Sequence, residues 1–128
     1  MEKLLLFQTD DTTSRKIAMI AGMLHIKTVR IPSTQFHCTI GELLDNPDIK
    51  KENPVLNTVP KESLMLMCNL SQVHFEDLLS RLRKNKISVD FKAILTPTNI
   101  EWDIPTLYKE MYAERDAIRT QTSTHKPN

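Results

Sequence analysis

The chain has 128 residues, of which 40% are hydrophobic and 26% are charged, a composition typical of one globular domain rather than a disordered chain. Lys and Arg number 17 against 16 Asp and Glu, so the broad positive field that sequence-independent nucleic-acid binding requires is missing. With two glycines, the chain lacks the means to build a phosphate-cradling loop, because such loops need several glycines where the backbone approaches the ligand.

No apolar run approaches the roughly 20 residues of a membrane span, and the apolar stretch near the N-terminus is too short for a secretory signal. Cys38 and Cys68 form no metal-ligand pattern or disulfide framework, which favours a reducing compartment. We therefore expect a cytoplasmic protein without membrane or nucleic-acid partners, and without a metal or other cofactor.

The first unit of the chain is predicted to be a strand, a helix and a second strand. Residues 4–7 (LLLF) form a continuous apolar run, which indicates a buried strand. Asp10 and Asp11 follow and are candidate N-caps of a helix whose apolar residues recur at helical spacing. Residues 27–31 alternate and stop at Pro32, which indicates a short strand near an edge.

Residues 33–61 have a different character. A short stretch of helical pattern at residues 39–44 is followed by three prolines among many charged residues. Connections of this length are rarely structureless in a compact domain. We expect an ordered insertion, part of it mobile, between the second and third strands.

A second unit repeats the plan of the first. Residues 64–68 (LMLMC) form another continuous apolar strand, Ser71 is a candidate N-cap of the next helix, and residues 91–95 form a fourth strand. A last amphipathic helix follows, and the polar residues 120–128 predict a disordered tail. One domain is therefore expected over residues 1–119.

Two architectures fit this order of elements. A ferredoxin-like α+β sandwich predicts alternating strands, whereas a sheet buried on both faces predicts continuous apolar runs. The two continuous runs favour an α/β fold, a small three-layer sandwich with a four-stranded, mostly parallel sheet of order 2-1-3-4. Such a fold is similar to a shortened flavodoxin-like fold, and the ferredoxin-like sandwich remains the alternative.

A parallel sheet predicts where a binding site lies. The carboxyl ends of its strands share one edge, and ligands bind there because helix N-termini converge on it. The candidate ligand-binding residues at this edge are Asp10, Asp11, Asn69, Ser71, Thr96, Thr98, Asn99 and Trp102, with Trp102 as a lid. The alternative interpretation is that these residues are only helix caps and turns. No residue is predicted to be catalytic or to bind a metal.

The most distinctive segment is residues 92–111, KAILTPTNIEWDIPTLYKEM. Its strand end at residues 95–99 (LTPTN) and the following Trp102 resemble a bacterial family known only as domain of unknown function 3783, which is common in clostridia. A looser likeness extends over residues 39–44 and 64–87. The resemblance implies no activity, cofactor or partner, because no function is assigned to the family.

We expect a non-catalytic binding or regulatory module, because the sequence has no nucleophile–base arrangement, no metal-ligand spacing and no glycine loop. The alternative is a small-ligand or phosphometabolite site, with or without enzymatic activity, at the carboxyl edge of the sheet. The partner is an unidentified protein or small ligand in these two cases. Unpaired backbone at the edge strands also predicts a homodimer.

Overall fold

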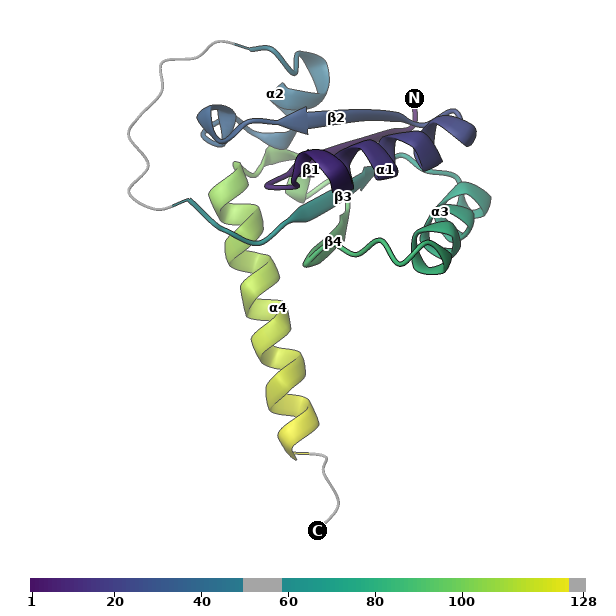
Figure 1. The fold of residues 1–128 in the computed structure, drawn as a ribbon. Coiled ribbons are helices and arrows are strands. Elements are labelled where there is room, and N and C mark those ends of the chain that lie inside the picture. The colour runs from purple at the N-terminus through teal and green to yellow at the C-terminus, as the bar shows by residue number, and fades with distance from the viewer. Residues whose placement is uncertain (50–58, 125–128) are drawn as a thin grey trace.

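Four strands form one sheet in the order β2-β1-β3-β4 in the computed structural model, which describes residues 1–49 and 59–124 (Figure 1). The strands are β1 Lys3–Phe7, β2 Lys27–Ile31, β3 Leu64–Cys68 and β4 Phe91–Ile94. The helices are α1 Asp11–Met23, α2 Ile40–Asp45, α3 Gln72–Lys84 and α4 Ile104–Thr124, with short 3-10 turns η1 Ser33–Gln35 and η2 Asn99–Glu101. The predicted α/β class and strand order are confirmed.

Helices cover both faces of this sheet (Figure 1). Leu4 and Leu6 of β1 pack in a core formed with α1 and α3. Leu5 and Phe7 of the same strand pack in a second core, on the opposite face, with α2 and the first turns of α4. The molecule is therefore a three-layer sandwich, and burial on both faces explains the continuous apolar runs.

The sheet is mostly parallel, as predicted, with one antiparallel pairing at its centre. Two of the three pairings, β1 with β2 and β3 with β4, are parallel, but β1 and β3 are antiparallel. A continuous apolar run reports burial on both faces and carries no information on direction. β3 therefore begins at the same end of the sheet as the one where β1 and β2 finish.

The two parallel pairs belong to two strand–helix–strand units of similar plan. The number of residues that separates β1 from β3 also separates α1 from α3. At that spacing each unit has one residue of positive φ after its first strand and another after its helix, and these residues are Gln8, His25, Asn69 and Lys86. Leu5 pairs with Leu66, its own counterpart. An approximate two-fold axis between these leucines therefore relates the first strand and helix of one unit to those of the other.

The last helix is longer than expected. It continues through residues 120–124, where a disordered tail was predicted, because no glycine or proline interrupts the segment before Pro127. Its C-terminal half projects away from the sheet (Figure 1), and the rest of the predicted tail, residues 125–128, lies outside the described residues. In the insertion 33–61, η1 and α2 provide regular structure, and residues 50–58 also lie outside the described part.

Candidate ligand-binding site

The antiparallel pairing of β1 and β3 divides the predicted binding residues between the two opposite edges of the sheet at which strands end. Asp10 and Asp11 follow the end of β1 at one edge. Asn69 and Ser71 lie at the other edge, together with the residues that follow β4, because β3 and β4 both end there. The single cleft expected from a parallel sheet therefore does not form.

Asp10 and Asp11 are both engaged at the start of α1. The carboxylate of Asp10 accepts the N–H of Thr13 at 2.7 Å and caps the helix, and this hydrogen bond lowers the pKa of Asp10. Asp11 pairs at 2.7 Å with Arg30, whose guanidinium also donates to the carbonyl of Thr9 at 2.8 Å. A helix cap and an exposed ion pair thus account for both acids.

Asn69 and Ser71 shape the turn from β3 into α3. Asn69 has a φ of 63°, in the left-handed region that asparagine tolerates better than most residues. The hydroxyl of Ser71 accepts the N–H of His74 at 3.1 Å and caps the helix. The carboxylate of Glu2 closes the turn, since it accepts the N–H of Ser71 at 2.8 Å and lies 2.7 Å from Nδ1 of His74.

This turn predicts a pH dependence of stability. The Ser71 N–H, with His74 beside it, lowers the pKa of Glu2 below its ordinary value of 4.5. A carboxyl group whose pKa is lowered by folding contributes stability above its unfolded pKa, and loses it as the pH falls through the folded pKa. We therefore expect wild type to melt at a higher temperature than Glu2→Gln at neutral pH, with the difference shrinking once the pH falls below 4.5 and lost as the pH passes through the lower folded pKa of Glu2.

Thermal melts followed by circular dichroism across this pH range measure the effect. Glu76→Gln, a change of an exposed acid on α3, is the control and should track wild type throughout. A constant difference between wild type and Glu2→Gln at every pH would contradict the assignment.

The TPTN segment is a turn held by its own side chains. Asn99 is 7% exposed, and its amide oxygen accepts the N–H of Thr96 at 2.8 Å while its amide nitrogen donates to the carbonyl of Ile94 at 2.9 Å. The hydroxyl of Thr96 accepts the N–H of Asn99 at 3.0 Å. Thr98 is exposed, and Trp102 is half-buried against the core beneath α4. These contacts favour the structural interpretation of Thr96 and Asn99.

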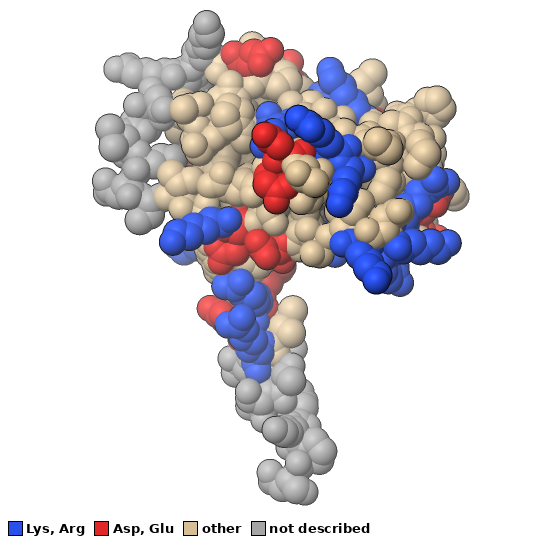
Figure 2. Space-filling model, in the orientation of Figure 1, with Lys and Arg blue, Asp and Glu red and all other residues tan. Residues whose placement is uncertain are grey.

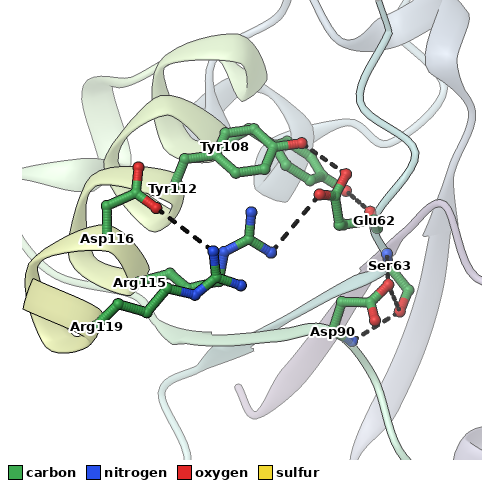
Figure 3. A network of polar contacts seen from close by, with 8 residues as sticks. All are labelled: Glu62, Ser63, Asp90, Tyr108, Tyr112, Arg115, Asp116 and Arg119. Carbon is green, nitrogen blue, oxygen red and sulfur yellow. Dashed lines mark hydrogen bonds and ion pairs between the residues drawn. The ribbon is translucent and has the colours of Figure 1, made fainter. Parts of the chain in front are cut away.

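A polar cluster lies where α4 meets the segment that leads into β3 (Figure 3). Tyr108 donates its hydroxyl to the backbone carbonyl of Glu62 at 2.7 Å, and Tyr112 donates to the Glu62 carboxylate at 2.7 Å. The carboxylate of Asp90 accepts the N–H of Ser63 at 2.9 Å. The cluster therefore ties the starts of β3 and β4 to one face of α4.

Arg115 extends the same cluster along α4 (Figure 3). Its guanidinium carbon lies 5.2 Å from the ring centres of both Phe91 and Tyr112, in the range of cation–π attraction. A guanidinium nitrogen is 3.7 Å from the carboxylate of Glu62. The hydrogen bond from Tyr112 lowers the pKa of Glu62, so Glu62 is held as a carboxylate whose charge is offset by the cation.

A hollow of about 460 Å³ opens beside this cluster, a size within the range of small-molecule sites. Its lining residues are Val59, Pro60, Lys61, Glu62, Pro105, Tyr108, Lys109 and Tyr112. Glu62 is bonded to the tyrosines and paired with Arg115. Among the described residues, Lys61 and Lys109 have no ion pair. The hollow thus combines an apolar, aromatic wall with a cationic rim.

Reasoning from the sequence missed this hollow, because its walls come from the insertion and from α4. One signal was present: Tyr108, Tyr112 and Arg115 recur at helical spacing and form an aromatic and cationic stripe. No pattern in the sequence links this stripe to Glu62.

Both cysteines are buried in the core on the α2 and α4 side of the sheet. Cys68 is fully buried, and burial raises the pKa of its thiol to about 12, so it stays protonated at neutral pH. Cys38 is also fully buried, with its sulfur 3.8 Å from Nε2 of His37. In the part of the chain that the structure describes, no three potential metal ligands gather, and none of the helices has the length and apolar character to cross a bilayer.

Comparison with known proteins adds one finding. Residues 63–118 match the model of a family described as a domain of unknown function (DUF3783), which confirms the resemblance noted for the LTPTN segment. The matched region contains β3, α3, β4 and most of α4, including the tyrosines and the arginine of the cluster. No curated protein and no solved structure matches the chain.

Proposed function

We propose that this chain is a non-catalytic binding module that takes a small organic anion with a flat apolar body into the hollow beside α4. The observation that carries the proposal is the aromatic and proline wall of the hollow next to Lys61 and Lys109. Ligand sites combine a mostly apolar lining with a few polar groups that orient the ligand. An anionic group of the ligand fits the two lysines.

The groups in the hollow are suited to binding rather than to acid–base chemistry. Burial raises the pKa of Tyr108 and of Tyr112, so both hydroxyls stay protonated and act as hydrogen-bond donors at neutral pH. Glu62 accepts from Tyr112 and faces Arg115, which engages it within the protein. The charges left to meet a ligand are therefore cationic.

The alternative, a small-ligand or phosphometabolite site at the carboxyl edge of the sheet, has less support. The carboxyl ends of β1 and β2 lie at one edge and those of β3 and β4 at the other. A ligand at either edge therefore meets the ends of two strands rather than four. The exposed residues among those predicted are Asp10, Asp11, Asn69, Ser71, Thr96 and Thr98, and they are divided between the two edges.

We place this module in the cytoplasm of a bacterium. The chain has two cysteines, both buried in the core, rather than the disulfide framework of a small secreted domain, which supports a reducing compartment. The proposed bacterial source rests on the resemblance of the LTPTN segment to the bacterial family described as a domain of unknown function.

A titration followed by amide NMR shifts tests the proposed function. The probes are a panel of aromatic carboxylates, and the corresponding aromatic amides serve as uncharged controls. We expect shifts confined to the residues around Tyr112 and Pro105 with the carboxylates and none with the amides. The double variant Lys61→Ala, Lys109→Ala should bind about tenfold more weakly, whereas Lys16→Ala on α1 should bind as wild type. If no carboxylate shifts the amide signals around Tyr112 or Pro105, the proposal is wrong.

A further inference from the structure

β4 forms one edge of the sheet and carries open backbone groups. The N–H groups of Phe91 and Leu95 donate toward β3 at 2.9 Å, so the intervening residues Lys92 and Ile94 direct their backbone groups away from the sheet. The carbonyl of Ile94 accepts from the side chain of Asn99. Among the described residues, the N–H and C=O of Lys92 and the N–H of Ile94 remain open at this edge.

A groove of about 440 Å³ lies beside this edge, between α3 and β4. Its apolar lining is Leu79, Leu82 and Ile87, and its charged lining is Arg83, Lys86 and Lys92. Ile94 projects on the same face of β4 as Lys92, because residues two apart in a strand share a face, and it is 53% exposed. An exposed apolar side chain next to open backbone groups is the arrangement that accepts an added strand.

The surface around this edge is positively charged. Lys and Arg side chains gather at the end of α3 (Figure 2). Arg83, Lys84, Lys86 and Lys92 are exposed, and within the described residues they form no ion pair. The nearest acid in sequence, Asp90, is bonded to Ser63. Such a surface attracts an acidic partner and repels a basic one.

From these three features we infer that the β4 edge binds an extended, acidic segment of a partner protein, which adds to the sheet as a fifth strand. Its backbone pairs with Lys92 and Ile94. Its apolar side chains pack on Ile94 and over the groove, and its carboxylates meet Arg83 and Lys86. This surface lies on the α3 side of the sheet and is separate from the hollow beside α4.

The opposite edge, β2, lacks this combination. Its exposed cations are Lys27 and Arg30, of which Arg30 is already paired with Asp11. Among the described residues, the large apolar side chains exposed to solvent do not include any of β2. Of the two edges, β4 is therefore the one suited to an acidic, partly apolar strand.

Fluorescence anisotropy with a labelled octapeptide of alternating glutamate and valine tests the inference. We expect this peptide to bind at low salt and to weaken as salt is added, and the matching lysine–valine peptide not to bind. Lys92→Glu should weaken binding about tenfold or more, whereas Lys16→Glu, the same charge change on α1, should leave it unchanged. Ile94→Pro should abolish binding with all charges retained, since proline removes an open N–H but is tolerated at an edge position.

Circular dichroism of each variant checks that the fold is intact. Equal weakening by Lys92→Glu and Lys16→Glu would mean non-specific attraction and overturn the inference, as would no binding of the acidic peptide at about 1 mM. Light scattering adds one further outcome. If the free chain is a dimer that Ile94→Pro dissociates, the occupant of this edge is a second copy and not an acidic segment.

Discussion

Replacing Asn99 with alanine is expected to lower the free energy of unfolding by about 2 to 3 kcal/mol. The Asn99 amide is buried and makes two hydrogen bonds to backbone groups, one to the N–H of Thr96 and one to the carbonyl of Ile94. Alanine removes both hydrogen bonds and leaves the N–H of Thr96 and the carbonyl of Ile94 without a protein partner. Urea unfolding at constant pH measures the loss.

Two matched variants separate the parts of this effect. Thr98 is exposed and precedes η2, but its side chain makes no capping hydrogen bond to that turn. Thr98→Val should therefore alter stability by less than about 0.5 kcal/mol. Asn99→Asp keeps an acceptor for Thr96 but places a buried carboxylate oxygen against the carbonyl of Ile94, so at neutral pH its loss should be at least as large as that of Asn99→Ala. A loss as small for Asn99→Ala as for Thr98→Val would show that the turn does not depend on this amide.

The same variant has a second expected consequence. In wild type the Asn99 side chain covers the carbonyl of Ile94 at the open edge of β4. Natural proteins protect such edges because an unpaired strand recruits other chains. Asn99→Ala should therefore also raise self-association on concentration, measured by light scattering, and Thr98→Val should not.

The layers of this fold were predictable because burial leaves a direct pattern in the sequence. Continuous apolar residues in β1 and β3 can be satisfied only by helices on both faces, and the structure has them. Short polar residues before each helix predicted caps, and Asp10 and Ser71 are caps. These features depend on neighbours in the chain or on burial alone.

The direction of β3 was not predictable in this way. The insertion after β2 is long enough to lead to a strand of either direction, and the apolar run is the same in both. The proposed cleft depended on that direction, so Asp10 and Asn99 were expected together and lie at opposite edges. The hollow beside α4 escaped prediction for a related reason, because Glu62 and Tyr108 meet only through tertiary packing.

Replacing Tyr108 with alanine is expected to have the largest effect of the single changes considered, a loss of about 3 to 5 kcal/mol in the free energy of unfolding. The ring is 1% exposed and lies 6.3 Å from the ring centres of both Phe36 and Phe91. Its removal leaves a cavity between α4 and the sheet, and it also frees the carbonyl of Glu62. Such a loss is a large share of the stability of a domain this size.

Tyr108→Phe isolates the hydroxyl, because it keeps the ring contacts and removes only the bond to Glu62. Its expected cost is about 1 to 2 kcal/mol, the penalty of a buried carbonyl left without a donor. Tyr112→Phe removes the bond to the half-buried Glu62 carboxylate, which water and Arg115 still reach, so its cost should be below about 1 kcal/mol. Urea unfolding of the three variants gives the ranking. Equal losses for the two phenylalanine variants would mean that water reaches the Glu62 carbonyl as well, and that Tyr108 holds the entry to β3 by packing alone.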